Sequence, residues 1–255
     1  LVGWIAPRGV VAAAVTGAFV PEAVPLVFLI ILVTVTLHGL SIRPLARRLG
    51  LAAASADGVL IVGSSPFSVP LAQQLTEAGV PVVVADRSWR RLRRARMAGV
   101  PFHYGEVLSE VSEETLDLSE IGHVLAMTGN HAYNALVCRH FSVELGHVRV
   151  FQLAISSKDE DDPRGFHPSI RGSTLFAEGA GYARLVRRHY EGWKFRRTTL
   201  TDEFGPEEFA ARLPEGALTL AIVGKNGTPG LVKGGAVPEP EVGDTILLYE
   251  PPGPG

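Results

Sequence analysis

The sequence has little cysteine and little net charge. Its 255 residues include one cysteine, Cys138, and 24 Lys and Arg against 26 Asp and Glu, which gives a formal net charge of -2. One thiol excludes an internal disulfide framework and a metal site built from several cysteines, as is usual in a reducing compartment. The balanced charge does not favour a nucleic-acid partner. We therefore predict that Cys138 is a small buried hydrophobic residue and that no nucleic acid is bound.

Metal-binding patterns and a leader sequence are also missing. The eight histidines form no pair at ligand spacing that carboxylates or cysteines support, so no metal is predicted. Leu1 leads directly into an apolar stretch, without a basic region or a small-residue cleavage site. We interpret the chain as a piece of a longer protein whose preceding part is missing.

Hydrophobic residues make up 46% of the sequence, which is high for a soluble protein, and the excess gathers in the first 50 residues. Residues 23–42 are uncharged, and 20 residues of helix span about 30 Å, the thickness of a bilayer's hydrocarbon core. A buried core helix is the alternative, but such a helix keeps a polar stripe, and residues 26–35 present apolar side chains on every face. The arginines at 43, 47 and 48 follow the span and favour the cytoplasmic side for the rest of the chain.

A second apolar segment, residues 9–20, precedes the first, and the stretch from Pro21 to Pro25 would turn the chain between them. The two are predicted to form a membrane helical hairpin, in which small residues allow close approach. Arg8 stands at the head of this segment. An arginine at membrane depth is costly unless it is paired or faces a wet cavity, so Arg8 is a candidate for the transport path. The alternative is an interfacial arginine that reaches the headgroups.

From Gly58 onward, short β-rich runs alternate with helical stretches, a pattern typical of βαβ units around a parallel sheet. The predicted strands are residues 58–63, 80–85, 100–104, 123–128 and 148–153. The predicted helices are residues 66–78, 88–98, 113–118 and 130–145. Such a Rossmann-like domain binds ligands at the carboxyl ends of its strands, where helix N-termini and loop amides face anions.

The first predicted strand ends where a dinucleotide fingerprint Gly-x-Gly-x-x-Gly would lie. Only Gly63 is present, and Ser65 and Ser68 replace the other two glycines. A serine in the second position crowds a pyrophosphate, so a mononucleotide is expected to compete well with a dinucleotide. Asp86 follows Gly63 by 23 residues, near the spacing at which an acidic residue binds a ribose. The alternative for Asp86 is a strand-end residue that caps the next helix.

Arginines crowd the helix after Asp86, at positions 90, 91, 93, 94 and 96. Such a run is usually a solvated face. Two functional alternatives remain open: contact with anionic lipid headgroups, or an anion-binding edge near Arg87 and Arg90.

The C-terminal third reads as a linker and a small α+β domain. Residues 156–170 are polar and turn-rich and predict an exposed linker. Strands are predicted at residues 193–200, 217–224 and 245–249, and a short helix at 206–212. Asn226-Gly227 is a strong hairpin signal.

Two parts of the chain resemble known families. Residues 3–11, with Gly-x-x-x-Pro-Arg-Gly, and residues 33–50, with His38 where glutamine is more usual, resemble two late helices of the sodium/proton antiporter family. Residues 57–153 resemble the TrkA N-terminal, or regulator-of-potassium-conductance, domain. The matching residues are Gly63, Asp86, Gly105-Glu106, Met127 to Asn130 and Asn134. Residues 237–248 are similar to the end of TrkA C-terminal domains.

These resemblances imply an α-helical membrane hairpin over residues 1–50, a Rossmann-like domain over 57–155 and a TrkA-C-like α+β domain over 171–250. They imply a multi-pass inner-membrane protein that exchanges Na⁺ or K⁺ for H⁺, with the lipid bilayer, its own missing transmembrane part and a second copy as partners. The implied ligand is NAD, NADH, AMP, ADP or ATP. The candidate binding residues are Gly63, Ser64, Ser65, Ser68, Asp86, Arg87, Gly105, Thr128 and Asn130.

Three functions remain open at this point. The favoured one is the regulatory tail of a secondary transporter, which is not an enzyme; because neither apolar segment contains Asp or Glu, the chain alone is not expected to transport ions. The second is a regulatory subunit of a potassium channel or uptake system, which a Thr-x-Gly-Tyr-Gly-like filter would support; none is present. The third is a membrane-anchored NAD-dependent oxidoreductase, for which Tyr133 and His131 are the nearby candidates, although helix capping suits them better.

Overall fold

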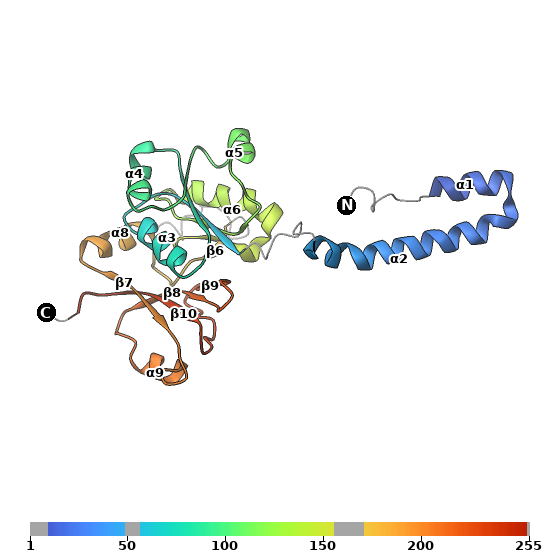
Figure 1. Ribbon diagram of the computed structural model, residues 1–255. Coiled ribbons are helices and arrows are strands. Elements are labelled where there is room, and N and C mark those ends of the chain that lie inside the picture. Colours follow the sequence, from blue (N-terminus) through green and yellow to red (C-terminus); the bar gives the residue numbers. More distant parts are fainter. Residues whose placement is uncertain (1–9, 49–56, 156–170, 254–255) are drawn as a thin grey trace. The chain divides into compact units, whose positions relative to one another are not determined.

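The computed structural model describes residues 10–48, 57–155 and 171–253 (Figure 1). The chain divides into two compact units, Leu1–Ala54 and Ser55–Gly255, which are described separately. Arg8 and the predicted linker at 156–170 lie outside the described residues.

The first unit is a pair of helices. Helix α1 spans Val10–Phe19, the 3₁₀ helix η1 spans Pro21–Ala23, and α2 spans Val24–Arg48. The Val20 amide donates to the Thr16 carbonyl at 2.7 Å and closes α1. Pro21 then opens η1, where a missing backbone donor costs nothing. Helix α1 turns back along α2 (Figure 1), so the predicted helical hairpin is present as a fold.

Together, η1 and most of α2 form a stretch with the length and composition of a membrane span. Among the described residues it is Pro21–Ile42 that qualifies, with a mean hydropathy of 2.4 and no part buried inside the protein. The hydroxyls of Thr34 and Thr36 donate to the carbonyls of Ile30 and Leu32, at 2.7 and 2.8 Å. Because these polar atoms are satisfied within the helix, they do not oppose an apolar surrounding.

The second unit is built on a six-stranded parallel sheet. Its strands are β1 Gly58–Val62, β2 Val82–Asp86, β3 Phe102–Tyr104, β4 Ile121–Ala126, β5 Val150–Gln152 and β6 Ser173–Thr174. Their order is β3-β2-β1-β4-β5-β6, with every pair parallel. This confirms the predicted Rossmann-like sheet and adds β6, from a segment that was assigned to the next domain. The strand order reverses between β1 and β4, which opens a crevice at the carboxyl ends.

Helices cover both faces of this sheet because its strands are apolar on both sides. The helices are α3 Ser68–Glu77, α4 Trp89–Met97, α5 Glu110–Thr115 and α6 His131–Leu145, followed by the 3₁₀ helix η2 His147–Arg149. In β1, Val59 and Ile61 belong to the core shared with α3, whereas Leu60 and Val62 belong to the core shared with α6. Cys138 of α6 is 1% exposed, as predicted, and burial raises the pKa of its thiol to about 12.

A second, antiparallel sheet follows. Its elements are α8 Tyr182–Tyr190, β7 Lys194–Thr199, α9 Pro206–Ala211, β8 Leu218–Val223, β9 Pro229–Leu231 and β10 Thr245–Glu250, with strand order β7-β10-β8-β9. The predicted hairpin is confirmed: the Gly224 amide donates to the Thr228 carbonyl at 3.0 Å, and Gly227 takes a positive φ of 81°. Helix α8 was not predicted.

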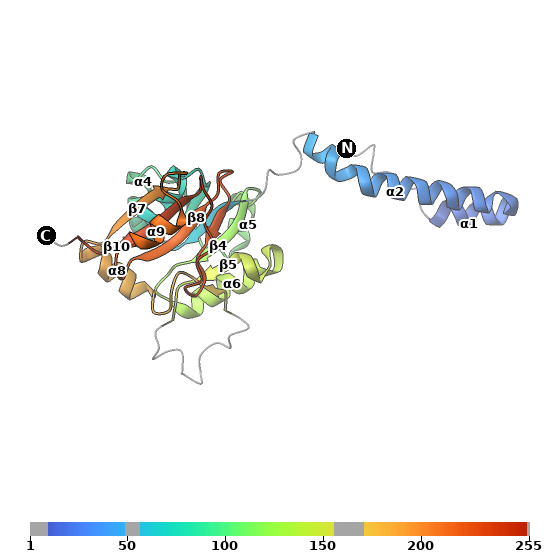
Figure 2. The same cartoon turned by 90° about the horizontal axis from the view of Figure 1, so that it is seen from below.

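The two sheets share one hydrophobic core. Tyr249 of β10 and Phe67 at the start of α3 meet with ring centroids 5.0 Å apart, and both are fully buried. Helix α3 lies between the sheets in Figure 1, and the antiparallel sheet lies in front of the parallel one when viewed from below in Figure 2. Phe209 of α9 covers the opposite face of the second sheet. Residues 57–155 and 171–253 therefore form one compact unit.

Candidate functional site: a crevice at the carboxyl edge of the parallel sheet

A cavity of about 380 Å³ lies at the carboxyl ends of β1, β2 and β4, where the strand order reverses. Its volume is near the lower end of the range of about 300 to 1,000 Å³ common for small-molecule sites. Seven of the predicted binding residues line it: Gly63, Ser64, Asp86, Arg87, Gly105, Thr128 and Asn130. Ser65 and Ser68 do not. The structure thus brings these seven residues together around one cavity, and their role in binding a ligand stays a prediction.

The turn after β1 is closed by its own serines. The Ser65 hydroxyl accepts hydrogen bonds from the amides of Phe67 and Ser68, at 3.3 and 2.9 Å. The Ser68 hydroxyl accepts from the Ser65 amide at 2.8 Å and donates to the Gly63 carbonyl at 2.7 Å. Both side chains are buried. Both hydroxyls therefore bond within the turn itself, and a contact of Ser65 and Ser68 with a ligand stays a prediction.

Asp86 is held by four N–H donors. Its carboxylate accepts from the Ser64 amide at 2.9 Å and the Ser88 amide at 2.7 Å. Arg91 adds a bidentate pair from Nε and Nη2, both at 2.8 Å. This hydrogen bond is the main reason that the pKa of Arg91 is raised. An ionised carboxylate has about four acceptor positions, so Asp86 has none left for a ribose. Of the two sequence interpretations, the structure shows the strand-end residue that binds the start of the next helix.

These contacts decide how a dinucleotide fits. In the usual pose, a pyrophosphate accepts hydrogen bonds from the amides of the first turn. Here the amides of Ser64, Ser65, Phe67 and Ser68 all have internal acceptors. The predicted contact of a phosphate with these amides is therefore not available. The turn as it stands does not fit a dinucleotide bound in this way.

Gly63 is required by the packing of neighbouring strands. It has a φ of +110°, and a Cβ there would lie 2.9 Å from Thr128 Cγ2 and 3.0 Å from the Met127 carbonyl oxygen. A side chain would push the end of β4 away from β1. Gly63 thus shapes the floor of the crevice, although it offers no amide to a ligand, since its N–H donates to the Ala85 carbonyl.

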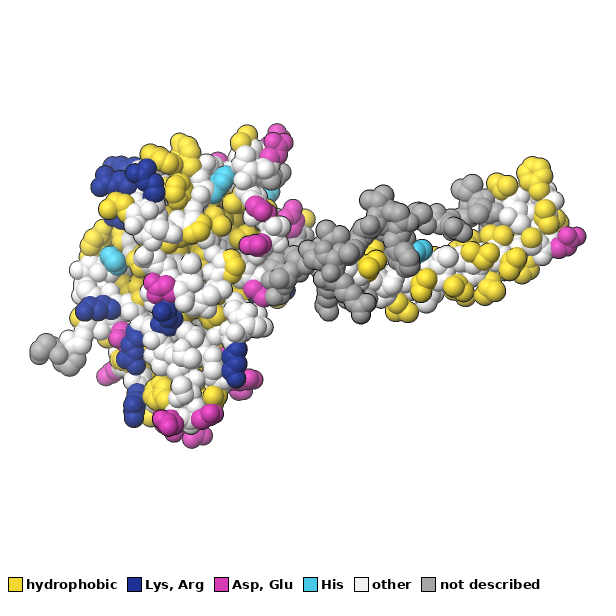
Figure 3. Space-filling model, viewed as in Figure 1, with side chains coloured by type: hydrophobic (Ala, Val, Ile, Leu, Met, Phe, Trp, Pro, Cys, Tyr) yellow, Lys and Arg dark blue, Asp and Glu magenta, His cyan; other side chains and the backbone are white. Residues whose placement is uncertain are grey.

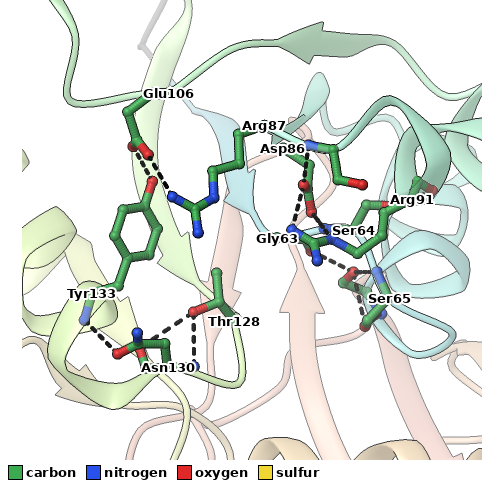
Figure 4. A network of polar contacts seen from close by, with 12 residues as sticks. Gly63, Ser64, Ser65, Asp86, Arg87, Arg91, Glu106, Thr128, Asn130 and Tyr133 are labelled. Atoms are coloured by element: carbon green, nitrogen blue, oxygen red, sulfur yellow. Dashed lines mark hydrogen bonds and ion pairs between the residues drawn. The ribbon is translucent and has the colours of Figure 1, made fainter.

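The other rim of the crevice carries an accessible cation. The Arg87 side chain is 75% exposed and has its Nη1 3.9 Å from Glu106 Oε2, a loose ion pair. The Tyr133 hydroxyl donates to the same carboxylate (Figure 4). Burial and the neighbouring Glu106 raise the pKa of Tyr133, so its hydroxyl stays protonated. Of the guanidinium groups on the rim, Arg87 has the most donors to offer an anion.

The N-terminus of α6 faces the crevice. The Asn130 side chain caps the helix by accepting from the Tyr133 amide at 3.0 Å, so capping belongs to Asn130 and not to His131 or Tyr133. Thr128 is fixed by Asn134, whose Oδ1 accepts from the Thr128 hydroxyl at 2.6 Å. First-turn amides lack acceptors inside their own helix and carry the positive end of its dipole. This end of the crevice therefore favours an anion.

Tyr182 forms a wall of the crevice that sequence reasoning missed. It comes from α8, and its ring packs on the backbone of Gly129, where a Cβ would lie 3.1 Å from Tyr182 Cδ1. The signal for α8 was present in the helical spacing of Tyr182 and the buried Leu185, with basic residues in the last turn. Sequence alone does not show that this helix returns to the crevice.

Among residues 10–48, 57–155 and 171–253, no group of three or more His, Cys, Asp or Glu side chains is placed to hold a metal ion. The crevice offers an apolar floor (Val62, Ala85, Val107 and Met127), the Arg87 cation and the head of α6. It suits a small ligand with an apolar, planar part and an anionic end.

The sheet order and the crevice define the class of domain, a Rossmann-type nucleotide-binding fold. Residues 59–162 match the family model of the TrkA-N domain, which bears out the resemblance drawn from the sequence. The chain therefore contains a TrkA-N domain. No curated protein matches the chain in sequence.

Solved structures with similarity to the chain include three of interest. The GsuK RCK domain is 15% identical with a TM-score of 0.39, over 77% of this chain and 44% of that one. The TrkA-N domain of the inner membrane protein ybaL from Escherichia coli is 18% identical, with a TM-score of 0.36, over 40% and 76%. The GsuK channel bound to NAD is 15% identical, with a TM-score of 0.37, over 76% and 36%. The chain thus spans less than half of the GsuK chains, and the family model is what identifies the domain.

Proposed function

We propose that the chain is the C-terminal part of a bacterial cation:proton antiporter, in which the TrkA-N domain regulates the exchange of Na⁺ or K⁺ for H⁺. One observation carries the proposal: a helix fit to cross a membrane, α2, is followed after residues 49–57 by a TrkA-N domain. The protein is then a multi-pass inner-membrane protein, its remaining helices upstream of Leu1, and a homodimer through its cytoplasmic domain.

The orientation follows from charge. Arginines at 43, 47 and 48 come after the span, and basic residues at the end of a span favour the cytoplasm. Protease added to sealed right-side-out cells is expected to leave the acidic segment at residues 159–162 intact and to cut it after the cells are opened. Cleavage in sealed cells contradicts the orientation.

The regulator is proposed to be an adenine mononucleotide, AMP, ADP or ATP, in preference to NAD or NADH. The amides of the Gly63–Ser68 turn already have acceptors, so the phosphate goes to the other rim, near Arg87 and the first turn of α6. The base then lies on the apolar floor around Val107. The second nucleotide of NAD or NADH would find no free N–H donors at the Gly63–Ser68 turn.

Calorimetry of the full chain against AMP, ADP, ATP, NAD and NADH tests this assignment. Arg87→Gln is expected to weaken mononucleotide binding by roughly ten-fold or more, because a hydrogen bond to a charged group contributes about 1.5–3 kcal/mol. Arg90→Gln removes the same charge from a nearby residue outside the crevice and is the matched control. If no nucleotide binds at millimolar concentration, nucleotide regulation of this protein is wrong.

A further inference from the structure

The exposed side of α4 carries cations that the fold does not use. Arg90, Arg93, Arg94 and Arg96 are all exposed, and none of them forms an ion pair with any residue that the structure describes. Arg91 of the same helix is the one paired with Asp86. Figure 3 shows the dark blue side chains gathered at the upper left of the domain, over α4, beside apolar side chains.

Large apolar side chains accompany these arginines. Trp89 is 53% exposed, Met97 75% and Tyr104, on the edge strand β3, 57%. The Trp89 ring is fixed edge-on against Phe102 and Tyr104, at centroid distances of 5.8 and 5.5 Å. We call Trp89, the four arginines, Met97 and Tyr104 the α4 face. Exposed apolar groups among charges mark an interaction site.

We propose that the α4 face docks on the anionic headgroups of the bilayer that α2 crosses. Guanidinium groups bind phosphate and carboxylate groups in bidentate fashion. Tryptophan and tyrosine favour the membrane–water interface, and an exposed methionine adds apolar area that reaches the acyl boundary. Anionic lipids are concentrated on the cytoplasmic leaflet, where this domain is proposed to lie. The inference rests on the membrane anchoring proposed above and is independent of nucleotide binding.

The charge of the α4 face and the length of the tether favour a membrane over a second copy of the chain. A symmetric dimer through this face would bring the same four arginines of two chains together, and like charges repel. Residues 49–57 join α2 to β1, and nine residues reach at most about 30 Å. A bilayer that α2 crosses is therefore always at high effective concentration near the domain.

A lipid-quenching experiment on the full chain tests this docking. The chain is placed in nanodiscs of phosphatidylcholine, with or without about 30% phosphatidylserine, and with nitroxide-labelled lipid as quencher. A fluorophore is attached to the thiol that Met97→Cys introduces. Labelling is selective for this thiol because Cys138 is buried and its pKa is raised to about 12. Val143→Cys, 79% exposed on α6, is the control position. Quenching is expected at residue 97 in anionic discs alone, and not at residue 143.

Charge variants then distinguish a specific role of the α4 face from an effect of the total charge of the domain. Replacing Arg90, Arg93, Arg94 and Arg96 by Gln is expected to reduce docking by about five-fold for each arginine, which corresponds to about 1 kcal/mol per charge near the surface. Replacing the same four by Lys should preserve docking. The matched control replaces four other basic residues by Gln and should leave docking unchanged. These residues, all exposed, are Arg139, Arg149, Lys194 and Arg212.

Several outcomes overturn the proposal. Equal quenching in neutral and anionic discs removes the electrostatic basis, and equal loss in both Gln variants removes the role of this face. Quenching that requires two chains per disc assigns the face to a second copy instead. A chain that does not enter nanodiscs refutes the membrane anchoring itself, whereas an inserted chain without quenching at residue 97 refutes only the docking.

Discussion

The Ser65–Ser68 pair allows a direct test of the closed turn. Ser68→Ala removes one buried hydroxyl, which leaves the Ser65 amide and the Gly63 carbonyl without their partners at 2.8 and 2.7 Å. Each buried group that loses its partner costs about 1–3 kcal/mol. Because the nearby crevice admits water, we take the lower part of this range and expect a loss of about 2–4 kcal/mol in unfolding free energy. Ser119→Ala, at an exposed serine, is the control and should change stability by less than about 0.5 kcal/mol.

Thermal unfolding of the full chain measures this loss. For a domain of this size, 1 kcal/mol shifts the melting temperature by about 2–4 °C, so Ser68→Ala should melt roughly 5–15 °C lower. A shift no larger than that of Ser119→Ala refutes the argument that Ser68 supports the turn.

The same pair should also govern ligand choice. The double variant Ser65→Gly with Ser68→Gly restores the glycine spacing of a dinucleotide fingerprint and frees the amides at 65, 67 and 68. Its affinity for NAD relative to AMP, measured by calorimetry, is expected to rise above that of the wild type. A wild-type chain that already binds NAD more tightly than AMP, with no change in the variant, contradicts the closed-turn argument.

Three further predictions follow from the pH dependence, the Tyr182 wall and the membrane segment. Burial, and then the charge of Arg149, lowers the pKa of His123 in the folded protein. The neutral His123 therefore contributes its full stability above about pH 6.5, and this contribution is lost as the pH falls toward the folded-state pKa. His123→Gln should flatten the decline in melting temperature below about pH 6.5. Gly129→Ala would place a Cβ 3.1 Å from the Tyr182 ring, and it should weaken nucleotide binding in calorimetry while Tyr182→Phe, which keeps the wall, should not. The chain alone in liposomes should show no cation-driven proton flux, whereas Arg8→Ala in a version with its upstream helices should lower exchange; flux from the chain alone would contradict the missing acidic site.

Local pattern was enough to place most elements, with errors that have local causes. The predicted strand at 100–104 begins two residues late in the structure, at Phe102, because Pro101 has no N–H for the ladder. The strand predicted at 123–128 ends at Ala126 in the structure. The amide and the hydroxyl of Thr128 donate to Asn134 Oδ1 instead of continuing the strand. The Asn226-Gly227 turn and the apolar helix α2 needed nothing beyond neighbouring residues.

The sequence by itself determined the type of sheet, the position of the crevice and the presence of a long apolar helix, because periodicity and turn chemistry are local properties. Tertiary structure decided what the crevice offers a ligand. A serine can be read at positions 65 and 68, but whether its hydroxyl faces a ligand or its own turn depends on backbone geometry. Asp86 is taken by Arg91, and Tyr182 reaches Gly129 across the fold. The contact of Tyr182 with Gly129 joins segments far apart in the chain. The bonds of Ser65, Ser68 and Asp86 join near neighbours, but they depend on backbone and side-chain geometry that the local pattern does not specify.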